Sequence, residues 1–368
     1  MKVEFNRAAL LEALGLVSSV VPSRTPKPIL RCVKIWAGDK DVRISATDLE
    51  VGINYVISEV SVAEKGETVV PADRLSAIVR ESADDILQIK ASDGKCEVIG
   101  SDSHFTVYGQ DSTGFPAVPC FDGKADIEVS LVNLRSAIEQ CLFATAKEST
   151  RYALNGVLWE AKAKKLALVA TDGRRLARVR VGLASAASEK ITAAKIIVPA
   201  KTMALIDKIA GSEKDIVSIK QVDNQILVNC GNVDISSSLV EGSFPKYEDI
   251  IPSDYQNKLS LPTEAALSAV RRAALLTSEE SRGIKMQLGK NKLIITGRAP
   301  EAGDAQVDMV VDYKGQAIEI GFNPQFIIDV LRVIKESTFE MEFGDAERPG
   351  LIKSGNDFLY VLMPINLG

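Results

Sequence analysis

The stretch LVATDGRRLA (residues 168–177) decides how this chain is organised, because two other stretches repeat its pattern at a nearly constant distance. Both are apolar runs that end in a turn at a threonine, ISATDLEVG (residues 44–52) and IITGRAPEAG (residues 294–303). The successive threonines are separated by 124 and 125 residues. Self-similarity at a fixed period indicates an internal repeat, here of the size of a small domain.

Two further patterns recur in the same order as the threonine turns. One is a strand-like segment that leads into an amphipathic helix, and the other is a strand whose Pro or Asn-Pro end suits the start of a second helix. These segments are residues 3–19, 127–143 and 259–276 for the first pattern, and residues 69–79, 197–206 and 321–331 for the second. Alternating strands around short Gly, Asp or Asn turns lie between them. We therefore expect three tandem copies of one α+β unit, each with about two helices and six to eight strands.

The joints between the copies are rich in proline. GFPAVPCFDGKAD begins at Gly114 and SFPKYEDIIPSDYQN begins at Ser243. A chain of 368 residues is also longer than one ordinary core requires. We expect three domains, at residues 1–122, 123–252 and 253–368.

Composition and charge exclude several classes of protein. With 46% hydrophobic and 25% charged residues, the chain is typical of a folded globular protein. It contains no apolar run long enough for a membrane helix and no pattern of a signal peptide, so we expect a cytoplasmic protein that does not bind a membrane. The formal net charge of −5 argues against a protein that coats nucleic acid non-specifically.

The six expected helices differ in charge from the rest of the chain, with ten basic against seven acidic residues. They are residues 7–19, 72–81, 131–141, 200–210, 263–276 and 325–335. One interpretation is the mixed charge of any solvated helix surface. The other is a common helix face with a mild positive potential toward a polyanion.

The sequence has few signs of catalysis. His104 is the only histidine, the five cysteines form no CxxC pair, and neither a GxxxxGK[ST] loop nor a GxGxxG loop is present. We therefore expect no cofactor and no metal. Asp48 and Asp172 each precede a turn, where an aspartate caps the following backbone. A carboxylate-dependent hydrolase on a repeated scaffold remains the alternative from another class.

Taken together, the three repeats, the central ATDGRRLA and the closing LYVLMPINLG resemble the bacterial DNA polymerase III beta subunit family, the sliding clamps. RTPKPIL from Arg24, TRYALNGVLWE from Thr150, EGSFPKYEDIIP from Glu241 and RGIKMQL from Arg282 also match, so the resemblance spans the whole chain. It implies a DNA clamp fold and a ring-shaped, head-to-tail homodimer with helices inside and sheets outside. Such a ring encircles duplex DNA without sequence specificity, confers processivity on the replicative polymerase, and is not an enzyme.

The resemblance also implies two kinds of binding position. Arg24, Arg74, Arg151 and Tyr152 match positions that face DNA, although Ala153 stands where many relatives have a second tyrosine. A groove for partner peptides is implied between domains 2 and 3, with Arg175 placed to hydrogen-bond the peptide and Arg174 where many relatives have histidine. Its matching residues are Leu154, Thr171, Gly173, Arg174, Arg175, Leu176, Pro245, Ile250, Val361, Met363 and Pro364.

The implied partners of the groove are the DNA polymerase III alpha subunit, the clamp loader complex, and other DNA polymerases and repair proteins that carry clamp-binding peptides. The implied ring seam pairs a strand of the first domain with a strand of the third. Its residues are Phe105 and Val107 on one side and Leu275 and Leu276 on the other, with Arg74 facing either DNA or the acidic Glu301 and Asp304. Ordinary core packing is the alternative for the four apolar residues. A clamp-like scaffold that binds proteins and no DNA is a third hypothesis.

Overall fold

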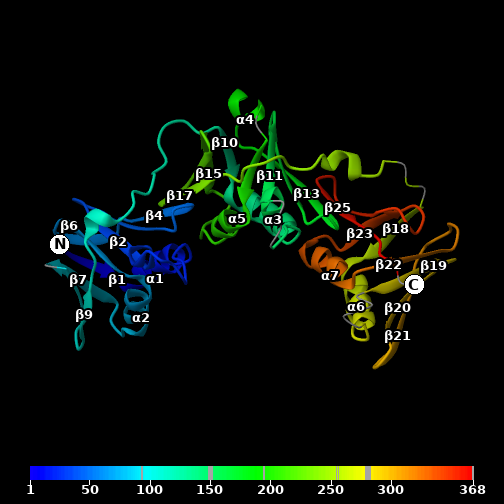
Figure 1. The fold of residues 1–368 in the computed structure, drawn as a ribbon, viewed down its shortest axis with the longest axis horizontal. Coiled ribbons are helices and arrows are strands. Elements are labelled where there is room, and N and C mark those ends of the chain that lie inside the picture. The colour runs from blue at the N-terminus through cyan, green and yellow to red at the C-terminus, as the bar shows by residue number, and fades with distance from the viewer. Residues whose placement is uncertain are drawn as a thin grey trace. The chain divides into compact units, whose positions relative to one another are not determined.

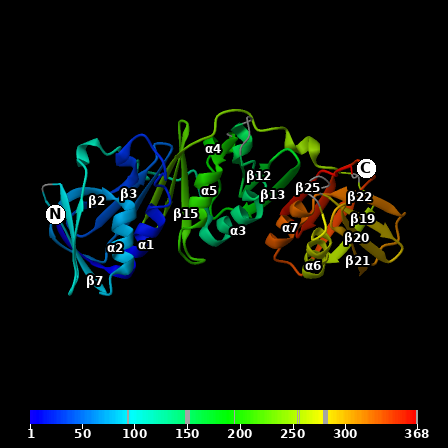
Figure 2. The same ribbon diagram turned by 60° about the horizontal axis from the view of Figure 1, so that its bottom comes forward.

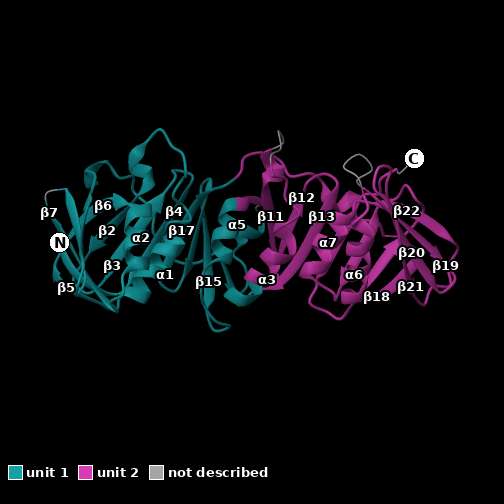
Figure 3. Ribbon diagram, turned by 90° about the horizontal axis from the view of Figure 1, so that it is seen from below, with its two compact units in different colours: residues 1–134, 183–193, 201–239 teal, residues 135–182, 194–200, 240–368 magenta. Residues whose placement is uncertain are grey.

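The computed structural model describes residues 1–92, 94–147, 152–193, 195–253, 255, 257–277 and 283–366. The chain forms two compact units (Figure 3). Unit 1 contains residues 1–134, 183–193 and 201–239, and unit 2 contains residues 135–182, 194–200 and 240–368. The middle repeat is therefore divided between the units, because its strands enter two different sheets.

Unit 1 is built on two antiparallel sheets. Eight strands follow the order β10-β15-β16-β17-β4-β3-β2-β6, and five strands follow the order β5-β1-β7-β8-β9. The strands are β1 (Lys2–Asn6), β2 (Cys32–Ala37), β3 (Val42–Thr47), β4 (Val51–Ile57), β5 (Val60–Glu64), β6 (Gly66–Pro71), β7 (Ile86–Ser92), β8 (Lys95–Ile99), β9 (His104–Tyr108), β10 (Ile127–Ser130), β15 (Ile216–Val222), β16 (Gln225–Cys230) and β17 (Val233–Ser238). Its helices are α1 (Arg7–Val17), α2 (Ala72–Glu81) and α4 (Glu189–Ala193), together with most of α5 (Ala200–Asp207).

Unit 2 has the same plan. Its eight-stranded sheet has the order β14-β11-β12-β13-β25-β24-β23-β18, and its four-stranded sheet has the order β21-β20-β19-β22. The strands are β11 (Gly156–Lys162), β12 (Lys165–Thr171), β13 (Arg175–Gly182), β14 (Ile196–Pro199), β18 (Asn257–Pro262), β19 (Ile284–Gly289), β20 (Lys292–Ala299), β21 (Gly303–Val310), β22 (Ile318–Phe322), β23 (Thr338–Phe343), β24 (Gly350–Ser354) and β25 (Phe358–Leu362). Its helices are α6 (Thr263–Ala274), α7 (Pro324–Val333) and most of α3 (Leu131–Leu142).

In each unit a pair of helices packs on the sheets. In unit 1, α1 and α2 lie side by side, with α1 against β3 and β4 (Figure 1). In unit 2, α6 and α7 lie side by side, with α6 against β20 and β21 (Figure 2). Leu10, Leu14 and Val17 are buried from α1 because they recur at helical spacing.

The starts of the helices follow from their capping residues. The Asn6 side chain accepts a hydrogen bond from the backbone N–H of Ala9 at 3.2 Å and so begins α1. The Asn323 side chain accepts one from the N–H of Gln325 at 2.9 Å, and Pro324 occupies the first turn of α7. The strand-to-helix anchors of the sequence therefore have a local physical cause.

The repeats are joined through their sheets. β17 of the second repeat pairs with β4 of the first, and β25 of the third repeat pairs with β13 of the second. In the order of strands within a repeat, β4, β13 and β21 are equivalent, and so are β9, β17 and β25. β9 and β21 are the two members of this series that end their sheets, each with one neighbour among the described strands.

The fold predicted from the sequence is confirmed as an α+β chain of three tandem clamp repeats. Each repeat has the two expected helices, and the described residues contain one further short helix, α4, which the sequence pattern did not predict. The described residues of the first repeat form nine strands, one above the expected range, because β5 has no counterpart in the other two repeats. Within the described residues, no helix is long and apolar enough to cross a membrane.

Candidate functional site

The turn between β12 and β13 is built by two side chains. The Thr171 hydroxyl donates to the carbonyl oxygen of Arg175 at 2.6 Å and accepts from the N–H of Gly173 at 3.1 Å. The Asp172 carboxylate accepts from the N–H groups of Arg174 and Arg175 at 2.9 and 3.0 Å. Gly173 has a φ of 87°, the left-handed region that favours glycine.

The first repeat contains the same turn. The Thr47 hydroxyl donates to the carbonyl oxygen of Val51 at 2.9 Å, and the Asp48 carboxylate accepts from the N–H groups of Glu50 and Val51 at 3.0 and 2.7 Å. Both aspartates therefore cap a turn, which confirms the structural interpretation of the ATD pattern. Leu49, with a φ of 83°, occupies the position of Gly173.

Arg175 points to the helix side of its sheet. Its Nη1 donates to Asp329 of α7 at 2.7 Å, its Nε to Asp172 at 3.0 Å, and its Nη2 to the carbonyl oxygen of Phe143 at 2.8 Å. The guanidinium also lies 4.4 Å from the ring centroid of Phe326. Burial lowers the pKa of Arg175, but the hydrogen bond to Asp329 and the neighbouring charges raise it by more. Arg175 therefore fixes the turn and β13 to α7, and its expected contact with a peptide stays a prediction.

The opposite, outer face of this sheet carries an apolar cluster. Tyr360 marks the helix face, because its hydroxyl donates to the carbonyl oxygen of Phe326 in α7 at 3.0 Å, and side chains alternate along a strand. We call the following buried residues the outer-face cluster: Ala153, Leu158, Val169, Leu176, Ile197, Tyr247, Tyr255, Leu351, Leu359 and Val361. Val240, Phe244 and Ile251 pack against it.

A segment that crosses the sheet, residues 240–253, is held in place by ion pairs and a hydrogen bond. The Tyr247 hydroxyl donates to Glu160 of β11, and Lys195 lies 2.6 Å from Glu160 and 3.7 Å from Glu248. Burial and the hydrogen bond to Glu160 raise the pKa of Tyr247. This tether holds Phe244 and Ile251, which adjoin Pro245 and Ile250 in sequence, against the outer-face cluster.

All eleven residues of the expected groove lie in unit 2. Leu154, Thr171, Leu176 and Val361 are buried, whereas Gly173, Arg174, Ile250 and Met363 are exposed. Arg175, Pro245 and Pro364 are partly exposed. The backbone N–H of Met363 donates to the carbonyl oxygen of Arg174 at 2.9 Å, which joins the C-terminal tail to the Gly173 turn. The buried residues thus form a base, and the exposed ones surround it at the surface.

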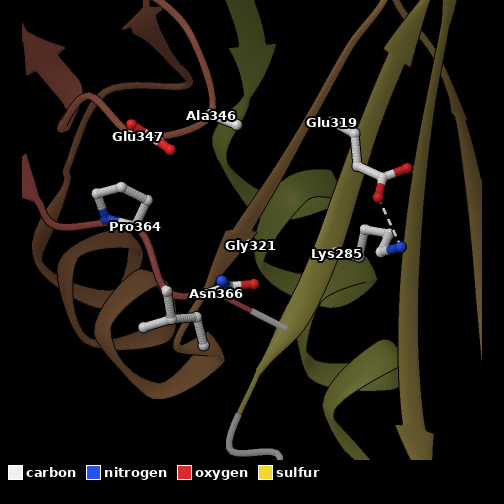
Figure 4. A pocket seen from close by; sticks show the side chains of 8 residues that line it. Lys285, Glu319, Gly321, Ala346, Glu347, Pro364 and Asn366 are labelled. Atoms are coloured by element: carbon white, nitrogen blue, oxygen red, sulfur yellow. Dashed lines mark ion pairs between the residues drawn. The ribbon is translucent and has the colours of Figure 1, made fainter. Parts of the chain in front are cut away.

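A pocket of about 420 Å³ lies along the same tail (Figure 4). It shares Pro364 with the expected groove, and a hydrogen bond of 2.9 Å from the N–H of Ile365 to the carbonyl oxygen of Gly321 holds the tail beside β22. Its lining residues are Lys285, Glu319, Gly321, Ala346, Glu347, Pro364, Ile365 and Asn366. The sequence analysis missed all of them except Pro364, because they come from two strands, a loop and the tail. The closing LYVLMPINLG was the one signal that pointed there.

The expected seam residues lie on or near the two unpaired edges. On β9, the side chain of Phe105 is 40% exposed, while Val107 is buried. At the end of α6, Leu275 is 79% exposed and Leu276 is partly exposed. Glu301 and Asp304 are exposed at the start of β21. Exposed apolar side chains beside an unpaired strand edge are typical of a surface that another chain covers.

The expected DNA-facing residues are exposed where the structure describes them. Arg24 lies in the loop after α1, Arg74 lies on α2, and Tyr152 begins a short 3₁₀ turn with 73% of its surface exposed. Arg151 lies outside the described residues. Among those described, no group of three or more His, Cys, Asp or Glu side chains is arranged to hold a metal ion.

Three α+β repeats joined through their sheets, two unpaired edges of complementary type, and a tail held against the Gly173 turn define a clamp-type protein. Family models agree, matching the N-terminal, central and C-terminal domains of the DNA polymerase III beta subunit at residues 1–119, 128–246 and 248–366. The chain belongs to the DNA polymerase III beta subunit family.

Individual relatives match over their full length. A beta sliding clamp of Pseudomonas putida is 33% identical over 370 residues, covering 100% of both chains. The crystal structure of a sliding clamp from Pseudomonas aeruginosa bound to griselimycin is 32% identical, with a TM-score of 0.93 and 100% of both chains covered. A DNA polymerase sliding clamp from Bacillus subtilis is 27% identical, with a TM-score of 0.93 over 100% of this chain and 99% of that one.

Proposed function

We propose that this protein is a DNA sliding clamp, a non-enzymatic factor that confers processivity on the replicative DNA polymerase. Two copies join head to tail into a ring around duplex DNA, and the same protein docks partner proteins through short peptides. The observation that carries the proposal is the equivalence of β9 and β21 to the strands that already pair inside the chain. β9 of one copy would therefore pair with β21 of the other copy, as the equivalent strands pair within the chain.

The internal joints specify the register of this seam. Ile53 lies opposite Ile235 in one joint, and Ala177 lies opposite Tyr360 in the other. The β-hairpin pairings make Val307 the equivalent of Ile53 and Ala177, because Gly52, Leu176 and Gln306 all face the turn threonine of their own repeat. Phe105 is likewise the equivalent of Ile235 and Tyr360. These three residues lie opposite Val98, Val228 and Ile352, which occupy the same place in the preceding strand of each repeat. We therefore place Phe105 opposite Val307 of the partner subunit and His104 opposite Asp308 of the partner subunit.

Disulfide cross-linking tests both the seam and its register. The substitutions His104→Cys and Asp308→Cys in one chain place two exposed thiols opposite each other in the ring, within the reach of a disulfide. Oxidation is expected to give a covalent dimer faster than for His104→Cys with Gln306→Cys or with Val310→Cys, which shift the pairing by two residues. A faster reaction of either shifted pair would overturn the register, and no cross-link in any of the three would overturn the seam.

The proposed DNA contacts are Arg24, Arg74, Arg151 and Tyr152. A closed ring is retained topologically, so weak contacts to phosphates suffice and leave the ring free to slide. The protein loaded on circular DNA is expected to stay bound, and to dissociate when the circle is cut. Equal loss from both forms would exclude a ring. If Arg24→Ala with Arg151→Ala changes neither loading nor retention, the scaffold that binds no DNA is favoured.

The proposed docking site comprises the eleven groove residues around the outer-face cluster, and its partners are the polymerase III alpha subunit, the clamp loader complex, and other polymerases and repair proteins. Buried apolar residues beneath an exposed methionine suit capture of an apolar peptide segment. Arg175 contributes by fixing the position of the turn.

We retain the domain boundaries 1–122, 123–252 and 253–368, and a cytoplasmic location follows from a role in bacterial replication.

A further inference from the structure

Arg178 lies beside the docking cluster on the outer face of β13. Leu176, Arg178 and Arg180 share this face because side chains alternate along a strand, and Leu176 belongs to the outer-face cluster. Arg178 pairs across the sheet with Val169 of β12 and Leu359 of β25, which are both cluster members. A cationic side chain therefore stands between two buried apolar neighbours of the docking site.

Within the part of the chain that the structure describes, the side chain of Arg178 makes no hydrogen bond or ion pair, and its Nε is buried without an acceptor. Burial lowers the pKa of Arg178, and the charge of Arg180 lowers it further, against smaller opposite effects of Tyr247, Glu248 and Glu160. A buried donor of a charged group that lacks an acceptor costs free energy. The Arg178 side chain therefore lacks an anionic hydrogen-bond partner in the free protein.

The two carboxylates whose charge acts on the pKa of Arg178 are already engaged elsewhere. Glu160 accepts from the Tyr247 hydroxyl and pairs with Lys195 at 2.6 Å, while Glu248 lies 3.7 Å from the same lysine. Two other cations of this sheet have partners, since Lys165 pairs with Asp357 at 2.9 Å and Lys353 with Glu342 at 2.8 Å. The lack of a partner at Arg178 is therefore a local property of the site.

We propose that Arg178 is a specificity-determining residue that binds an acidic side chain of the docked peptide. This inference rests on the proposed docking function. A guanidinium and a carboxylate form two parallel charge-assisted hydrogen bonds, which a neutral amide cannot match. Two residues along a strand span about 7 Å. The preferred peptide therefore carries Asp or Glu about two residues from the apolar side chain that packs on Leu176.

Peptide binding to the full-length protein tests the proposal. The probes are two synthetic peptides of identical apolar sequence that carry either Asp or Asn two residues from the apolar side chain expected on Leu176. The wild-type protein is expected to bind the Asp peptide about tenfold more tightly at low salt. Arg178→Met is expected to abolish this difference, and Arg178→Lys to retain part of it. Arg43→Met, which removes an arginine that packs on Trp36 of unit 1, controls for net charge and is expected to keep the difference.

Equal discrimination by wild type and Arg178→Met would overturn the proposal, as would equal binding of both peptides to the wild type. Failure of the wild type to bind either peptide would instead contradict the docking function itself. Removal of an unpaired, partly buried charge is also expected to stabilise the free protein. The Tm of Arg178→Met should therefore equal or exceed that of the wild type, and a lower Tm would contradict the absence of a partner for Arg178.

Discussion

At the scale of single residues, Gly173 is required for its backbone conformation and not for space. Its φ of 87° suits glycine, yet a Cβ placed there would meet no atom within 4 Å. Gly173→Ala is therefore expected to lower the free energy of unfolding by about 1 kcal/mol. Gly182→Ala is the matched control, because Gly182 has open space and no positive φ. Urea unfolding measures both, and a Gly173→Ala variant as stable as Gly182→Ala would refute the argument from strain.

The ion pairs of Arg175 and Lys165 differ in burial, so we expect different costs of breaking them. The side chains of Arg175 and Asp329 are 10% and 20% exposed, whereas those of Lys165 and Asp357 are 58% and 47% exposed. Arg175→Met leaves Asp329 without its cation in a buried site, and we expect a loss of about 3 kcal/mol. Lys165→Met should cost less than about 1 kcal/mol. Denaturant midpoints of the two variants compare them, and similar losses would contradict the structural role of Arg175.

The orientation of Arg175 is a residue-scale feature that the family resemblance did not reveal. The alternation of RLARVRV places Leu176, Arg178 and Arg180 on one face and Arg175 on the other. The strand periodicity of the sequence therefore indicated that Arg175 and Leu176 lie on opposite faces of the sheet. The partner of Arg175 could not be predicted, because Asp329 is 154 residues away and reaches it only through the packing of α7.

At the scale of elements, the helices were predictable because their causes are local. Five expected starts, at residues 7, 72, 131, 200 and 263, coincide with the observed ones. Proline or a capping residue beside an amphipathic run determines such a start. The pairings of β17 with β4 and of β13 with β25 were not predicted. The sequence of an edge strand does not specify which distant strand pairs with that edge.

Glu342 joins three strands of unit 2 and makes their packing sensitive to acid. It lies on β23, with Lys258 of β18 at 2.9 Å and Lys353 of β24 at 2.8 Å. Burial raises the pKa of Glu342, but the two lysines lower it by more, so the net pKa is below its usual range.

A lowered pKa in the folded state stabilises the protein above the pKa of the unfolded chain, and this contribution is lost as the pH falls. Glu342→Gln should therefore be less stable than the wild type at pH 7, with a difference that shrinks below about pH 4.5. Unfolding curves at pH 7, 5 and 3.5 measure this trend. A difference that is constant across this range would show that the ionised carboxylate is not what stabilises the three strands.

At the scale of the whole molecule, the proposed ring places the chain's only histidine at the seam. His104 lies 3.5 Å from Glu97 of its own copy, and the proposed register sets it opposite Asp308 of the partner subunit. Two lysines compete for these carboxylates, since within one copy Lys292 pairs with Asp308 at 2.9 Å and Lys90 lies 3.9 Å from Glu97. A permanent positive charge at position 104 would add a favourable cross-strand pair at each of the two seams.

One opposite-charge pair across strands contributes about 0.2–1 kcal/mol, and like charges directly opposite each other destabilise the pairing by a similar amount. His104→Lys should therefore tighten the ring, with a dimer Kd about three- to tenfold lower than that of the wild type, whereas His104→Glu should raise the Kd. Analytical ultracentrifugation measures both values. Asp308→Asn, which removes the carboxylate opposite position 104, is expected to cancel most of the gain from His104→Lys. If His104→Lys and His104→Glu give the same Kd, position 104 does not face Asp308, and the register inferred from the internal joints is wrong.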